Sequence, residues 1–163
     1  MKKPIDHEKL HNYLSEHHLG SAAGLEHFAS AKRMWADTQH AEVFHSLWLQ
    51  VMEDQQDLER ILKKLGREPR GLALLAEPWA KLLGKINLLN PLRQRRKTLA
   101  QTQLDVLTGL LNAKQSMWRT LLLMVGEEPT LDEALLSDLK LRAESQIRQL
   151  SEFSDSSWAE RFR

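Results

Sequence analysis

The sequence predicts an all-α protein that folds as a bundle of four long helices. Four segments carry apolar residues spaced three and four apart, which is the period of one helix face. Strong helix formers dominate the composition, whereas Gly and Pro number only 7 and 5. No alternating apolar and polar run is long enough for a strand. At 163 residues, the chain fits a single domain.

The first two helices form a predicted hairpin over residues 6–65. The first helix covers about residues 6–35, and its inward stripe is Leu10, Leu14, His17, Ser21, Leu25 and Phe28. Asp37 and Thr38 make a short break that can cap the next helix. The second helix covers about residues 39–65, and its stripe is Val43, Leu47, Val51, Asp54, Leu58, Ile61 and Leu65. Gly66 is expected to end it.

A crossover over residues 66–97 separates this hairpin from a second one over residues 98–153. The crossover holds three prolines and three glycines, so we expect only a short helix, around Trp79 to Ile86. The third long helix should end near Val125, and the fourth should begin near Pro129 and Thr130. Residues 154–163 are expected to form a loose or docked tail.

Two hairpins joined by one long crossover are the topology of ferritin-like four-helix bundles. The alternative is an irregular five-helix array in which the crossover helix is a full member.

Several short stretches also resemble an uncharacterised bacterial branch of the ferritin-like superfamily. They are the first-helix run YLSEHHLGSAAGLE over residues 13–26, Glu53-Asp54, KLLGKINLL over residues 81–89, and Lys114 ahead of WRTL over residues 118–121. The resemblance implies the fold and no particular activity.

The di-iron ligands of ferritin-like proteins are expected to be missing. Such sites take Glu-x-x-His from two of the four helices. Glu42 and His45 have this spacing, but helix periodicity places both on the solvent side. No histidine follows residue 45, so a second such motif cannot exist. We therefore expect no metal site and no cofactor.

All seven histidines instead lie in the first 45 residues. We interpret them as solvated surface residues, with His17 partly buried. The alternative is that this His-rich hairpin binds a transition metal. The seven are His7, His11, His17, His18, His27, His40 and His45.

Four polar residues fall on the inward faces near the middle of the bundle: Asp54, Lys114, Arg142 and Gln146. Burying an unpaired charge there would cost roughly several kcal/mol. We therefore predict that Asp54 pairs with Lys114 or with Arg142. His17 or Ser21 could complete the hydrogen bonding. Such a pair would lie roughly where a metal-binding relative holds its ions. Alternatively, Lys114 extends to a bundle edge and Asp54 lies at the border of its stripe.

Gly20 and Gly24 lie four residues apart on one helix face. Small residues at this spacing permit close helix approach. We interpret them as a tight contact inside the bundle, with a homodimer face as the alternative.

The crossover is strongly basic, with eight basic and two acidic residues between Gly66 and Lys97. Its candidate surface patch is Lys81, Lys85, Arg93, Arg95, Arg96 and Lys97. The patch could bind an anionic membrane surface or nucleic acid, or the segment could simply cap the end of the bundle with its cations in water.

These observations favour a non-catalytic module that acts by partner binding or self-association. The sequence shows no phosphate-binding loop and no cysteine, which excludes thiol nucleophiles and zinc–thiolate sites. The N-terminus lacks a secretory segment, and no apolar run approaches the roughly 20 residues of a membrane span. We therefore expect a cytoplasmic protein. The metal-binding and membrane or nucleic-acid readings remain alternatives.

Overall fold

The computed structural model describes residues 3–68 and 95–163, and this part of the chain is helical without a strand. Four long helices form the bundle: α1 (His7–Met34), α2 (Ala41–Lys64), α4 (Arg95–Leu122) and α5 (Glu133–Ser156). A short helix, α6 (Trp158–Phe162), follows α5 at the C-terminus. The expected crossover helix lies outside the described residues.

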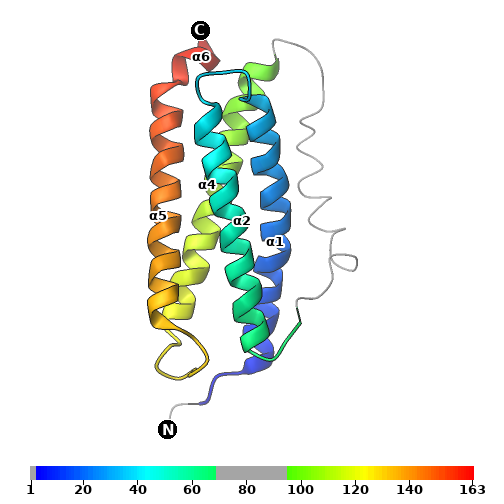
Figure 1. Ribbon diagram of the computed structural model, residues 1–163, viewed down its shortest axis with the longest axis vertical. Coiled ribbons are helices and arrows are strands. Elements are labelled where there is room, and N and C mark those ends of the chain that lie inside the picture. Colours follow the sequence, from blue (N-terminus) through cyan, green and yellow to red (C-terminus); the bar gives the residue numbers. More distant parts are fainter. Residues whose placement is uncertain (1–2, 69–94) are drawn as a thin grey trace.

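The helix order confirms the prediction of two antiparallel pairs. Helices α1 and α2 pack together, as do α4 and α5, and α1 also packs on α4. Figure 1 shows α1 and α5 running one way and α2 and α4 running the other. Because α2 and α4 run in the same direction, the end of α2 and the start of α4 lie at opposite ends of the bundle.

Local sequence signals set several of the helix ends. Asp6 and Asp132 cap α1 and α5, since their carboxylates accept hydrogen bonds from the backbone N–H groups of Lys9 and Leu135 at 3.1 Å. Gly66 follows α2 with φ +77°, the left-handed conformation that favours glycine.

Three predicted boundaries were wrong. Helix α4 begins at Arg95 and ends at Leu122, about three residues earlier than expected at each end, and turns lead from it to α5. Helix α5 continues three residues past Phe153. The remainder of the predicted tail is docked, because the guanidinium of Arg161 is buried and bonds to Gln101 on α4 and to Ser157.

The apolar core is divided into two halves along the bundle axis. One cluster lies near the N-terminal end of α1 and includes Leu14, Leu58, Met117 and Leu139. The other lies near the α1–α2 turn and comprises Phe28, Ala31, Trp35, Phe44, Leu47, Val51, Ala100, Leu104, Leu107, Leu111, Leu150 and Phe153. The two clusters are separated by about two turns on α2, α4 and α5, and by about four turns on α1, from Leu14 to Phe28. This gap holds the polar residues of the mid-bundle.

Candidate functional site

A buried polar network occupies the gap between the two core clusters. Lys114 of α4 donates hydrogen bonds to Asp54 Oδ2 of α2 and to Gln146 Oε1 of α5, both at 2.5 Å. Gln146 Nε2 also donates to Asp54 Oδ2, at 2.9 Å. Asp54 is 1% exposed and Gln146 is fully buried. The structure therefore contains the ion pair that the sequence predicted, and a buried amide completes it.

Arg142 of α5 extends this network toward solvent. Its Nη1 lies 3.1 Å from Asp54 Oδ1, and its Nη2 donates to Asp57 Oδ2 at 2.6 Å. Asp57 also accepts a hydrogen bond from Arg60. Burial lowers the pKa of Arg142, but hydrogen bonding to Asp57 and the charges of Asp54, Asp57 and Asp138 outweigh it, so the net direction is upward. Arg142, which the sequence predicted as an alternative partner of Asp54, is therefore a second partner beside Lys114.

Asp57 also belongs to this network and was not predicted, although the sequence holds a signal for it. Asp57 lies three residues after Asp54 and four before Ile61, so it shares their helix face. Burial opposes ionisation of this carboxyl, but hydrogen bonds from Arg60 and Arg142 outweigh it and lower its pKa.

Lys114 is the group whose environment is most unusual. Its side chain is only 15% exposed, so it does not extend to a bundle edge. Burial lowers its pKa below the ordinary 10.5, although the charge and hydrogen bond of Asp54 act the other way. Arg142 adds to the lowering as a nearby like charge.

His17 and Ser21, the other two predicted members, do not bond to this network. The Ser21 hydroxyl donates to the backbone oxygen of His18, within its own helix. His17 makes an edge contact with the ring of Tyr13, with centroids 4.7 Å apart. Burial lowers the pKa of His17, and the charge of Glu16 opposes this only partly.

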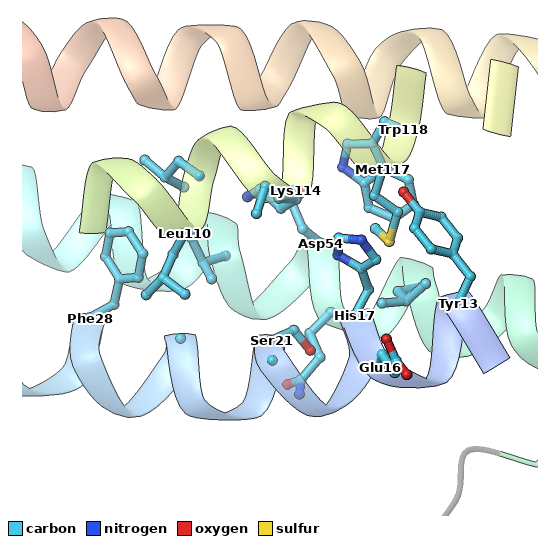
Figure 2. Close-up of a pocket in the computed structure, with 17 residues that line it drawn as sticks. Tyr13, Glu16, His17, Ser21, Phe28, Asp54, Leu110, Lys114, Met117 and Trp118 are labelled. Carbon is cyan, nitrogen blue, oxygen red and sulfur yellow. The ribbon is translucent and has the colours of Figure 1, made fainter. Parts of the chain in front are cut away.

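A pocket of about 290 Å³ lies beside the network, between α1, α2 and α4. Figure 2 shows His17 and Ser21 on one wall, with Lys114, Met117 and Trp118 opposite. Asp54 and Lys114 belong to both the network and the pocket, and their ion pair forms the floor toward α5. Most of the lining is apolar, including Phe28, Val51, Leu58, Leu110 and Leu111.

The two glycines of α1 line this pocket and do not make the tight contact we expected. A Cβ atom at Gly20 would meet nothing within 4 Å, and one at Gly24 would meet only Leu110 Cδ1, at 3.9 Å. No backbone approaches either residue that closely. The missing side chains therefore leave open space between α1 and α4.

The histidines differ in part from the surface interpretation. Glu42 and His45 are exposed, as predicted. His11 and His18, however, are buried, and His18 Nε2 lies 2.9 Å from the carboxylate of Glu59 on α2. The side of α1 that carries His18 faces Glu59 of α2, whereas His17 lies on the side that lines the pocket. Within residues 3–68 and 95–163, no three His, Asp or Glu side chains are grouped to hold a metal ion.

The predicted basic patch of the crossover lies only partly within the described residues. Lys81, Lys85 and Arg93 lie outside the described residues, and Arg95, Arg96 and Lys97 form the first turn of α4. No helix in the described part of the chain is both long enough and apolar enough to cross a membrane.

Comparison of the chain with protein-family models, with curated proteins and with solved structures finds no match.

Proposed function

We propose that this protein is a non-catalytic binding module with a ferritin-like topology, which holds a small apolar molecule in its mid-bundle pocket. The antiparallel pairs and the shared direction of α2 and α4 support the ferritin-like relationship. The binding function has a separate basis, because fold alone does not determine function.

The observation that carries the proposal is the pocket itself. Protein interiors pack with few voids larger than a water molecule. A space of about 290 Å³ is near the lower end of the range for small-molecule sites. Gly20 and Gly24 keep it open where most side chains would reduce it. An apolar ligand would regain the contacts that the pocket walls lack.

Equilibrium dialysis tests this proposal with a neutral hydrocarbon probe, 2-isopropenylnaphthalene. Gly20→Leu places four carbon atoms in the pocket, whereas Gly109→Leu adds the same atoms at an exposed position of α4 that also has nothing within 4 Å. We expect the unmodified protein and Gly109→Leu to bind the probe equally. Gly20→Leu should bind it at least about tenfold more weakly, because losing burial of only two CH₂ groups already costs about 1.6 kcal/mol.

Failure of the unmodified protein to retain the probe would overturn the proposal. Equal retention by Gly20→Leu would also overturn it, since the probe would then bind elsewhere. Thermal unfolding of both variants checks that each is folded. Both variants should be at least as stable as the unmodified protein, because replacing a helical glycine should raise stability.

A further inference from the structure

One residue that lines the pocket carries a hydrogen-bond donor with no acceptor. The indole Nε1 of Trp118 is completely buried and has no partner in the described structure, and Trp118 lines the pocket. In Figure 2 this nitrogen is on the edge of the ring that faces Lys114 and His17. Leaving a buried donor unpaired is unfavourable, so an acceptor placed in the pocket would remove a standing cost.

Lys114 supplies a second donor on the same wall. An ammonium group has three N–H donors, and two of them bond to Asp54 and Gln146. Lys114 lies four residues before Trp118 on α4, so both side chains project from one helix face. The remaining N–H of Lys114 can therefore serve the same ligand as the indole.

The charges around the pocket disfavour an anionic ligand. The positive charge of Lys114 is already matched by Asp54 at 2.5 Å. In the whole connected group the carboxylates outnumber the cations: Asp54, Asp57, Glu53 and Asp138 against Lys114, Arg142 and Arg60. Glu16 adds a further carboxylate to the pocket lining. A negatively charged ligand would therefore be buried near an excess of carboxylates without a free cation to pair with.

Building on the proposed function, we infer that the pocket selects an uncharged molecule with an apolar body and one carbonyl or hydroxyl oxygen, which accepts hydrogen bonds from Trp118 Nε1 and Lys114 Nζ. The apolar body fills the space left by Gly20 and Gly24. His17, on the opposite wall, offers a ring nitrogen to a ligand hydroxyl.

Three probes of matched shape separate the possibilities by equilibrium dialysis: the ketone 2-acetylnaphthalene, its hydrocarbon analogue 2-isopropenylnaphthalene, and the anion 2-naphthoate. We expect the ketone to bind about tenfold more tightly than the hydrocarbon, the ratio that about 1.4 kcal/mol of hydrogen bonding produces. The carboxylate should bind more weakly than the ketone.

Two tryptophan variants test the role of the indole donor. Trp118→Phe removes it, and the preference for ketone over hydrocarbon should fall from about tenfold toward about two- to threefold, with Lys114 as the remaining donor. Trp35→Phe is the matched control, because Trp35 is also buried with an unpartnered Nε1 but lies outside the pocket. The preference should be unchanged in this control.

The outcomes distinguish this inference from the proposed function. If no probe binds, the binding function itself is wrong. If ketone and hydrocarbon bind equally, the pocket binds apolar molecules and the inference of polar selection is wrong. Tightest binding by 2-naphthoate would also overturn it, as would a ketone preference that survives Trp118→Phe undiminished.

Discussion

The buried ion pair between Asp54 and Lys114 makes a quantitative prediction for Lys114→Met. The substitution retains an unbranched chain but leaves the carboxylate of Asp54, 1% exposed, without its closest cation. Removing one partner of a buried pair costs about 3–5 kcal/mol. Arg142 and Gln146 still contact Asp54, so we expect a value near the lower limit, about 3 kcal/mol.

A second variant separates this cost from ordinary packing. Asp54→Asn in the Lys114→Met background removes the uncompensated charge, while Arg142 keeps Asp57 as its partner at 2.6 Å. The double variant should therefore be more stable than Lys114→Met alone, by about 1 kcal/mol or more. This recovery would identify the lost stability as electrostatic.

Urea unfolding measures both effects, provided that the slope with denaturant stays constant. Lys140→Met is a suitable control, because Lys140 and Glu144 form a partly exposed i,i+4 pair at 2.9 Å. Such pairs contribute less than about 1 kcal/mol. If Lys114→Met loses no more stability than Lys140→Met, or if the double variant is less stable than Lys114→Met, the network does not act as a buried, charge-balanced unit.

Three further predictions concern stability. Gly20→Ala should raise the free energy of unfolding by about 1 kcal/mol, since its Cβ meets open space within a helix. Gly66→Ala should lower the free energy of unfolding by about the same amount, because Gly66 has a φ of +77°. Chemical denaturation measures both changes, and a loss of stability in Gly20→Ala would contradict the open pocket wall. Because burial lowers the pKa of His17 below 6.5, His17 is protonated in the unfolded chain before it is protonated in the folded protein as the pH falls, and stability should decline below about pH 6.5. His17→Gln should make this decline shallower. An unchanged dependence of stability on pH in this variant would refute the prediction. Arg161→Met should lower the free energy of unfolding by about 2 kcal/mol and speed hydrogen exchange over residues 157–163, because it removes the hydrogen bonds that dock α6. Unchanged hydrogen exchange in this segment would contradict the prediction.

Periodicity predicted much of the fold and the centre of the site. The stripes on the second and third helices placed Asp54 and Lys114 inward, and charge balance then required that they meet. The inward face predicted for the fourth helix likewise placed Gln146 inside the bundle. These predictions succeeded because each depended on the rotation of a single regular helix.

Features that depend on the spacing between helices could not be predicted in this way. The stripe predicted on α1 was incomplete, because Leu10, Leu14 and Phe28 fit a face that includes either His17 or His18. Only the actual packing of α1 on α2 buries His18 and leaves His17 in the pocket. The pocket itself arises from the separation of α1 and α4 beside Gly20, and one-dimensional periodicity contains no information about that distance.

The most direct test of the mid-bundle binding site is an NMR measurement of where a probe binds. Methyl groups of the five methionines can be labelled with ¹³C, and Met117 alone lines the pocket among the methionines that the structure describes. With 2-acetylnaphthalene bound, we predict nuclear Overhauser contacts between its ring protons and the Met117 methyl group. Contacts only to the methyl groups of Met1, Met34, Met52 or Met124 would place the probe elsewhere and contradict the account.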